Sequence, residues 1–343
     1  MRRSAYTWLA SALITTPSAI SASRSANADL PLAVGPAISA IGFLDGETLL
    51  FIATLIASER LEAGDISAAA DRLADAGARN GQPRWIEQGI ACDLGFDGDP
   101  VGARAALEGA FAGVDVIVQR EADRRRSMLV ADMDSTMITI ECIDELADYA
   151  GIKPQIAEIT ERAMRGELDF EGALDARVAL LKGLDAAVID RCHAERVVIM
   201  GGARELVRTM RANGADCYLV SGGFTLFADR VAAEIGFTRA LSNVLEFAGG
   251  KLAGTVSRPI VGAAAKRETL LAEAAAHGLS ASQCLAVGDG ANDIPMIEAA
   301  GLGVAYHAKP KTAAAAGARI DHCDLGALLY AQGYARKDWV AEF

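Results

Sequence analysis

The stretch MLVADMDST, residues 128–136, joins a short apolar run to a polar cluster that contains two aspartates. Two later stretches have the same form, namely CYLVSGG at residues 217–223 and CLAVGDGAND at residues 284–293. Continuous apolar runs of strand length are typical of parallel strands that are covered on both faces. Ligands bind beyond the carboxyl ends of such strands, so we expect the three polar clusters to converge in space.

The segments around these runs complete an α/β domain that we expect to span residues 127–343. Its first insertion, at about residues 141–196, carries apolar side chains at near-helical spacing, at Leu168, Phe170, Leu174, Val178 and Leu181. An insertion directly after the first strand would lie over the strand ends as a helical cap. Residues 241–256, with two glycines at their centre, predict a β-hairpin, and residues 302–306 predict a further strand.

A smaller α+β unit is expected before this domain, over residues 49–120. Its pattern alternates strands and helices, with strands predicted at 49–58, 84–94 and 114–119 and helices at 65–79 and 99–113. This β-α-β-α-β order is typical of a small ferredoxin-like module. The charged run at residues 121–126 contains three consecutive arginines and predicts a solvated linker between the two units.

Residues 1–48 predict either a disordered extension or a signal-like segment. Arg2 and Arg3 precede a short apolar stretch at residues 8–14, and the Ala-Asn-Ala at residues 26–28 resembles a cleavage site. The apolar stretch is short, so a low-complexity extension, or a start codon assigned too early, accounts equally well for the sequence of residues 1–48. We expect a cytoplasmic protein, with export as the minor alternative. No run approaches the ~20 apolar residues that span a bilayer, which argues against a membrane partner.

Composition excludes other classes of protein. A formal net charge of −12 argues against a non-specific nucleic-acid binder, because counterion release needs clustered Lys and Arg. The six cysteines never form a C-x-x-C pair and only four histidines are present, which argues against a structural zinc site. Several cysteines stand inside apolar runs, as expected of free thiols in a reducing compartment.

The aspartates at two of the strand ends predict a metal site. Asp132 and Asp134 stand two residues apart, and their charges repel unless a cation lies nearby. Asp289 and Asp293 supply further carboxylate at the end of another predicted strand. A single aspartate there is usually a helix N-cap, but four of them flanked by glycines favour a site for Mg²⁺, which prefers hard oxygen ligands.

Two weaker signals point to phosphate. Ser221, Gly222 and Gly223 offer a hydroxyl and unhindered backbone N–H groups, although alone they resemble an ordinary turn. Lys266 opens a helical stretch, where a lone lysine is usually a surface residue. The stretch Gly-Asp-Gly at 288–290 is not a dinucleotide fingerprint, because position 293 holds Asp where the third glycine belongs.

The order of these motifs resembles that of the haloacid dehalogenase superfamily of phosphatases, whose four motifs match DMDST at 132–136, SGGF at 221–224, Lys266 and GDGAND at 288–293. MRGELDF at 164–170 and RVALLKG at 177–183 resemble the cap of its phosphoserine-hydrolysing branch. The resemblance covers roughly residues 127–333. It implies a Rossmann-like parallel sheet with a helical cap insertion, and the preceding unit resembles, more loosely, the ACT module found in some relatives.

The resemblance implies a magnesium-dependent phosphatase with a phospho-aspartyl intermediate. Asp132 would be the nucleophile, and Asp134 would be the general acid and base. Mg²⁺ would be held by the carboxylates of Asp132 and Asp289 and by the backbone carbonyl of Asp134. Asp293 would orient the water shell of the metal.

The resemblance also implies how phosphoserine, a small-molecule substrate, would be held. The groups on the phosphoryl oxygens would be Ser221, Gly222, Lys266 and Asn292. In the cap, Glu141 would bind the ammonium group and Arg177 the carboxylate, with Met164 and Phe170 closing over the site.

Other functions remain open at this level. A related enzyme would hydrolyse another small phosphomonoester such as phosphohomoserine, or transfer the phosphoryl group to a different acceptor. A serine-sensing binding module with a vestigial catalytic domain is disfavoured, because the set Asp132, Asp134, Ser221, Lys266, Asp289 and Asp293 is complete. The pattern leaves open whether the N-terminal module binds serine, forms a homodimer or acts as a spacer.

Overall fold

The computed structural model describes residues 49–341, without the side chain of Met164. The extension predicted at residues 1–48 lies outside the described residues. Within residues 49–341, no helix is long and apolar enough to cross a membrane.

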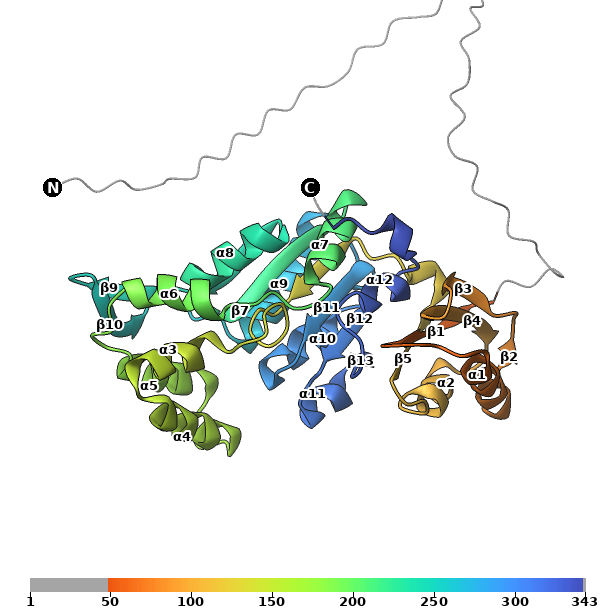
Figure 1. The fold of residues 1–343 in the computed structure, drawn as a ribbon, viewed down its shortest axis with the longest axis horizontal. Coiled ribbons are helices and arrows are strands. Elements are labelled where there is room, and N and C mark those ends of the chain that lie inside the picture. Colours follow the sequence, from red (N-terminus) through yellow and green to blue (C-terminus); the bar gives the residue numbers. More distant parts are fainter. Residues whose placement is uncertain (1–48, 342–343) are drawn as a thin grey trace, which may run out of the picture. The chain divides into compact units, whose positions relative to one another are not determined.

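An antiparallel sheet and two helices form the N-terminal module, residues 49–120 (Figure 1). Its elements are β1 (Phe51–Ala57), α1 (Ala63–Asp75), β2 (Arg79–Asn80), β3 (Arg84–Glu87), β4 (Ala91–Asp97), α2 (Pro100–Leu107) and β5 (Val114–Arg120). The strand order is β2-β4-β1-β5, with β3 also paired to β4. The single strand predicted at residues 84–94 is wrong, because the chain reverses at Gly89, whose φ of +75° favours glycine.

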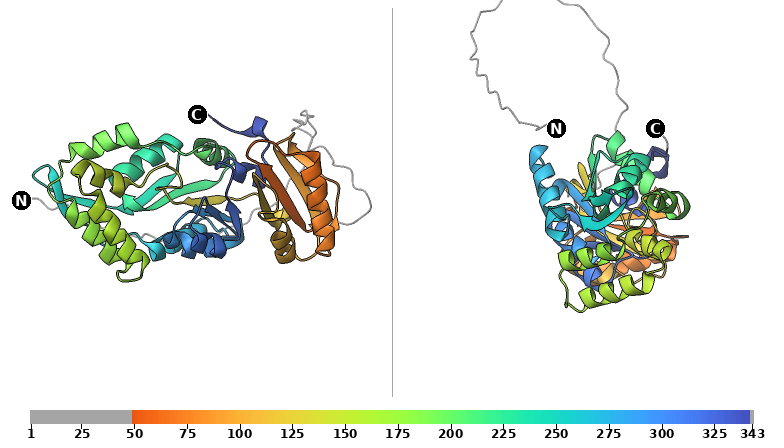
Figure 2. Two further views of the ribbon diagram at one scale, coloured as in Figure 1. Left: turned by 60° about the horizontal axis from the view of Figure 1, so that its bottom comes forward. Right: turned by 90° about the vertical axis from the view of Figure 1, so that its left-hand side faces the viewer.

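The two faces of this sheet are buried in different ways. Alternate residues of β1, Ala53 and Leu55, pack with Leu73 of α1 and Leu107 of α2, and both helices lie on one side of the sheet (Figure 2). Ile56 on the same strand points the other way and belongs to the larger hydrophobic core of the parallel sheet described below. Alternation along the strand thus gives the module a second apolar face, which the rest of the chain covers.

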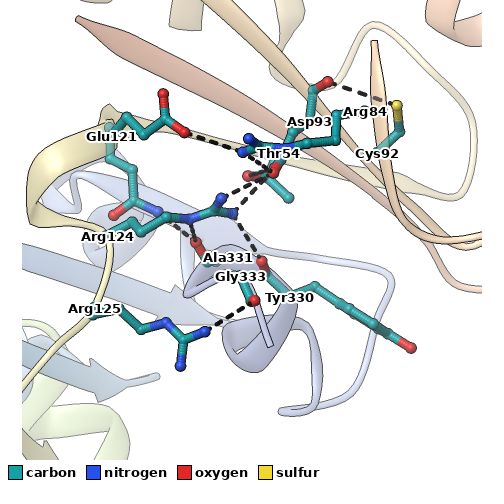
Figure 3. Close-up of polar contacts among 11 residues, drawn as sticks. Thr54, Arg84, Cys92, Asp93, Glu121, Arg124, Arg125, Tyr330, Ala331 and Gly333 are labelled. Atoms are coloured by element: carbon teal, nitrogen blue, oxygen red, sulfur yellow. Dashed lines mark hydrogen bonds and ion pairs between the residues drawn. The ribbon is translucent and has the colours of Figure 1, made fainter. Parts of the chain in front are cut away.

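Polar contacts also join the module to the C-terminal part of the chain. The buried carboxylate of Asp115 accepts hydrogen bonds from the backbone N–H groups of residues 321–323, at 2.8, 3.2 and 2.8 Å. Arg124 donates to both carboxylate oxygens of Asp93, at 2.9 and 3.1 Å, and to the carbonyls of residues 330 and 331 (Figure 3). These bonds hold the face of the sheet that α1 and α2 leave uncovered against the segment around helix α12 (Ala327–Ala331).

The solvated linker predicted at residues 121–126 is therefore wrong. Glu121–Asp123 forms a short 3-10 helix, and Arg126 is only 5% exposed. Arg126 donates to the side-chain oxygen of Gln119 at 2.7 Å. Arg126 is buried and Arg124 is partly buried, because carboxylate, amide and carbonyl acceptors from the module and from the C-terminal part of the chain meet them, whereas Arg125 is exposed.

Six parallel strands form the second sheet, in the order β13-β12-β11-β6-β7-β8. They are β6 (Met128–Ala131), β7 (Asp216–Phe224), β8 (Arg239–Asn243), β11 (Cys284–Gly288), β12 (Leu302–Tyr306) and β13 (Ala318–Ile320). The chain leaves β6 toward β7 on one side and reaches β11 on the other, so the topological switch point lies between β6 and β11. The predicted α/β fold class, with its parallel sheet, is confirmed.

Helices cover both faces of this sheet. Leu129 and Ala131 of β6 pack on one face with α7 (Ala203–Ala212), α8 (Thr225–Ile235) and α12. Met128 and Val130 pack on the other face with α9 (Ala263–Ala276) and α10 (Ile294–Ala299). The remaining short elements are α11 (Pro310–Ala315) and 3-10 turns at Ala281–Gln283, Ala291–Asp293 and Arg336–Asp338.

The insertion predicted after the first parallel strand contains four helices. These are α3 (Cys142–Ala150), α4 (Lys153–Met164), α5 (Phe170–Leu180) and α6 (Ala187–Arg196). A hairpin, β9 (Leu245–Ala248) and β10 (Lys251–Val256), joins them through backbone bonds between Leu252 and residues 183 and 184. The hairpin predicted from residue 241 is wrong for its first residues, because Leu241 pairs with Val220 in the main sheet as part of β8.

Candidate active site

The three polar clusters meet at the carboxyl ends of β6, β7 and β11. β6 and β11 are neighbours in register, with Ala131 opposite Val287, and the N–H of Asp132 donates to the carbonyl of Val287 at 3.0 Å. Carboxylate oxygens of Asp132, Asp289 and Asp293 lie within 4.8 Å of one another, and Asp132 and Asp293 are buried, while Asp289 lines the pocket. The convergence expected from the strand pattern is therefore observed, and this cluster has the ligand chemistry that a hard cation requires.

A buried lysine neutralises part of this charge. Lys266 on α9 is 0% exposed, and its Nζ lies 2.6 Å from Oδ1 of Asp132 and 2.6 Å from Oδ1 of Asp293. Burial by itself lowers the pKa of Lys266, but the two carboxylates outweigh it and raise the pKa above its ordinary value. The lysine therefore stays charged beside the group predicted to be the nucleophile.

Asp134 occupies a different position from the cluster. Its Oδ1 accepts a hydrogen bond from the N–H of Cys142 at 3.3 Å, at the start of α3. Its Oδ2 lies over Gly223, where a Cβ would come within 2.8 Å of it, so glycine is needed there. Burial, followed by the Glu141 carboxylate, raises the pKa of Asp134 well above its ordinary value. A carboxyl group with such a pKa can hold a proton at neutral pH and deliver it.

The last residues of β7 present the groups predicted to hold phosphate. Ser221 is buried, and its Oγ accepts the N–H of Gly223 at 2.8 Å. Asn243, at the end of β8, holds this end of β7 in place, because its Nδ2 donates to the carbonyl of Gly222 at 2.9 Å and its Oδ1 accepts the N–H of Val261 at 2.8 Å. The sequence pattern did not point to Asn243, since nothing in its neighbourhood distinguishes it from a strand-end asparagine.

A pocket of about 460 Å³ lies between the strand ends and the insertion. Its lining includes Asp132, Asp134, Glu141, Phe170, Arg177, Ser221, Gly222, Asp289, Asn292 and Lys309. Nearly all the predicted site residues therefore surround one cavity, while Lys266 and Asp293 lie beneath its lining. The side chain of Met164 is outside the described part of the chain. Lys309 was not predicted, because nothing in the sequence links residue 309 to the aspartates.

Phe170 closes against two glycines. A Cβ at Gly222 would lie 3.0 Å from the ring atom Cζ, and a Cβ at Gly262 would lie 3.0 Å from Cδ1. These distances are shorter than ordinary carbon contacts, so both positions need glycine for the ring to lie where it does. The aromatic ring is thus the point at which α5 contacts the carboxyl end of β7.

Two opposite charges face the pocket from the insertion. Glu141 accepts a hydrogen bond from Ser135 Oγ at 2.8 Å, and burial raises its pKa above the ordinary value. Arg177 donates from Nε to the carbonyl of Ala173 one turn earlier in α5, at 3.2 Å. One acid and one planar cation that line the same cavity form a pair that suits a zwitterionic ligand.

Two motif hydroxyls also take part, although the sequence pattern assigned them no role. Thr136 is fully buried, and its Oγ1 donates to Oδ1 of Asp289 at 3.1 Å. Ser135 contacts Glu141 as described above. Their place directly after Asp134 was the available signal, but it did not say which carboxylate each hydroxyl would meet.

The parallel sheet, the helical insertion after its first strand and the carboxylate–lysine cluster together define the class of capped α/β hydrolases. Residues 129–298 match the family model described as haloacid dehalogenase-like hydrolase. A phosphoserine phosphatase from Polaromonas is 46% identical over 207 residues, which cover 59% of this chain and 88% of that protein. The chain belongs to the haloacid dehalogenase-like hydrolase family.

Other relatives carry the same description. Phosphoserine phosphatases from Streptomyces coelicolor and Archaeoglobus fulgidus are 44% identical over 246 residues and 43% identical over 220 residues. The matches cover 71% and 63% of this chain, and 60% and 64% of those two proteins. The chain thus spans less than two thirds of the length of these curated relatives.

Solved structures extend the likeness to both sheets. A probable phosphoserine phosphatase from Vibrio cholerae has a TM-score of 0.68 and 35% identity, and covers 86% of this chain and 90% of its own. A HAD family hydrolase from Salmonella enterica has a TM-score of 0.73 and 27% identity, over 82% of this chain and 98% of its own. A structure described as a phospho-aspartyl intermediate analogue of phosphoserine phosphatase has a TM-score of 0.56 and 35% identity, over 60% of this chain and 98% of its own.

Proposed function

We propose that the protein is a magnesium-dependent phosphoserine phosphatase, which hydrolyses O-phospho-L-serine to L-serine and phosphate through a phospho-aspartyl intermediate on Asp132. The observation that carries this proposal is the position of Asp132, which lies between Lys266 and Asp289 at the base of the pocket. The names of the similar proteins and of the solved structures support the same substrate.

The two oxygens of Asp132 differ in their surroundings. Oδ1 accepts the N–H of Met133 at 2.8 Å and contacts Nζ of Lys266 at 2.6 Å. We infer that Oδ2 attacks phosphorus, because Oδ1 is held by these two donors. A carboxylate needs no base for this attack, since it is already ionised at neutral pH.

The raised pKa of Asp134 suits the proton transfers of both half-reactions. In the first, the bond from Asp132 to phosphorus forms, the bond from phosphorus to the serine oxygen breaks, and Asp134 gives its proton to that oxygen. In the second, water attacks phosphorus and Asp134 takes its proton. The bond from phosphorus to Asp132 then breaks, which releases phosphate and restores both carboxyl groups.

The cluster of carboxylates fits Mg²⁺. Burial, followed by the charge of Asp132, raises the pKa of Asp289, as expected where negative groups gather in a buried site. Asp132 and Asp289 would hold the metal with the backbone carbonyl of Asp134, and Asp293 would orient its water. Bound there, Mg²⁺ would neutralise charge on the transferring phosphoryl group. Ser221, Gly222, Lys266 and Asn292 would bind the phosphoryl oxygens.

The head group of the substrate would lie between the two charges of the insertion. Glu141 would bind the ammonium group and Arg177 the carboxylate, while Phe170 would exclude water above the end of β7. We also propose that residues 127–343 are the catalytic domain, with a cap at about 141–196, and that residues 49–120 are an ACT-like module. The match of the family model to residues 129–298 and the separate sheets of the two parts support this division.

A phosphate-release assay tests the proposal. We expect release from phosphoserine in Mg²⁺, loss of the activity in EDTA, and recovery when Mg²⁺ is returned. Phosphohomoserine and phosphothreonine, tested beside it, separate phosphoserine from related substrates. Equal activity on all three compounds, or activity that EDTA leaves unchanged, would contradict the proposed substrate or the proposed metal.

A further inference from the structure

Ser135 has an unusual backbone conformation directly after the two motif aspartates. Its φ of +55° lies in the left-handed region, which non-glycine residues seldom adopt, and His307 is the only other such residue within residues 49–341. The N–H of Ser135 donates to the carbonyl of Ile140 at 3.2 Å, which holds the turn. Backbone strain of this kind persists where the surroundings enforce it, and it gathers at functional sites.

The turn directs the hydroxyl of Ser135 at one carboxylate oxygen. Its Oγ donates to Oε1 of Glu141 at 2.8 Å. Ser135 itself does not line the pocket, whereas Glu141 does. Any effect of the hydroxyl on a bound substrate therefore passes through Glu141.

The start of α3 explains why Glu141 is free to be held in this way. Glu141 stands at the N-cap position, yet its side chain makes no capping hydrogen bond to its own helix. Asp134 instead accepts the N–H of Cys142, the first residue of the helix. Because Asp134 accepts the hydrogen bond from this helix N-terminus, the Glu141 carboxylate can turn toward Ser135 and the pocket.

We propose that Ser135 is a positioning residue that determines specificity for an ammonium-bearing substrate, by holding Oε1 of Glu141 so that Oε2 faces the pocket. The inference rests on the proposed function, in which Glu141 binds the ammonium group of phosphoserine. The left-handed turn is the structural device that brings the hydroxyl within reach. Substrates without an ammonium group gain nothing from this arrangement.

The test compares phosphoserine with its deamino analogue, which keeps the phosphate and the carboxylate but has hydrogen in place of the ammonium group. In the full-length protein with Mg²⁺, Ser135→Ala should lower kcat/KM for phosphoserine about five- to twentyfold more than for the analogue. Most of this loss should appear in KM. Ser67→Ala, an exposed serine on α1, is the matched control and should change neither value.

Two further variants separate positioning from folding. Ser135→Gly removes the hydroxyl and also relieves the left-handed strain, so it should fold at least as well as the wild type and show the same ammonium-specific loss. In a Glu141→Gln background, Ser135→Ala should cause little additional loss, because the carboxylate that it positions is absent.

The outcomes distinguish this inference from the proposed function. A wild type that does not prefer phosphoserine over the analogue overturns both. A wild type that prefers phosphoserine, with Ser135→Ala and Ser135→Gly lowering both activities equally, overturns only the role of Ser135. Additive losses in the double variant also overturn that role.

Discussion

Replacement of Lys266 by methionine tests the electrostatic design of the site. Lys266 is fully buried, and its Nζ lies 2.6 Å from each of two carboxylates, Asp132 and Asp293. Methionine keeps most of the side-chain volume but leaves these two buried carboxylates without their cation. Removal of one partner from a buried ion pair costs about 3–5 kcal/mol.

Proton uptake limits this cost and makes it depend on pH. Burial, followed by the charge of Asp132, already raises the pKa of Asp293 to about 7 in the presence of the lysine. Without Lys266 the folded-state pKa rises further above the unfolded value, so the variant is most stable at low pH and loses stability as pH increases. We expect metal-free Lys266→Met to lose about 3 kcal/mol at about pH 8 and about half of that at about pH 6.

Thermal unfolding in EDTA at the two pH values measures the effect. A loss of about 3 kcal/mol corresponds to a Tm decrease of roughly 4–5 °C for a protein of this size. Lys311→Met, on an exposed face of α11, is the control and should leave Tm unchanged. A Tm for Lys266→Met that equals the wild-type value at the higher pH would refute the reasoning. The same variant should lose at least about a hundredfold in kcat.

Three other changes follow from single contacts. Asp93→Ala leaves Arg124 without its carboxylate partner and should lower the free energy of unfolding by about 3 kcal/mol in urea titrations. An unchanged midpoint would show that this ion pair contributes nothing. Asp289→Asn removes a carboxylate whose pKa in the folded state is raised by burial, so the metal-free variant should be at least as stable as the wild type near neutral pH in thermal scans. The variant should also lose the Tm increase that Mg²⁺ causes. A retained Mg²⁺ effect would contradict the ligand assignment. Gly222→Ala places a Cβ 3.0 Å from the Phe170 ring and should raise KM several-fold in steady-state kinetics, and an unchanged KM would mean that the ring yields freely.

The sequence was sufficient for features that depend on local pattern. The apolar run from Met128 to Ala131 ends at Asp132, and the same pattern recurs at β7 and β11, so the parallel sheet and the meeting of the three clusters were predictable. Strand ends of neighbouring parallel strands lie at one edge of a sheet whatever the loops between them do. The position of Lys266 was different, because only the resemblance to a known family distinguished it from a surface lysine.

Features that depend on distant partners could not be predicted. Arg126 is buried and Arg124 is partly buried, because acceptors such as Gln119 on β5 and Asp93 on β4 meet them. A run of charges carries no local sign of such partners, so the expectation of a solvated linker failed. The contact of Ser135 with Glu141 likewise depends on a left-handed turn, and a serine in the sequence does not indicate a positive φ.

Trapping the covalent intermediate tests the central role of Asp132 most directly. Protein that is turning over phosphoserine with a radiolabelled phosphoryl group is quenched in acid, and its peptides are mapped by mass spectrometry. We predict label and phosphate on Asp132 alone, and neither label nor turnover in Asp132→Asn. Label on another residue, or Mg²⁺-dependent turnover that survives in Asp132→Asn, would contradict the account.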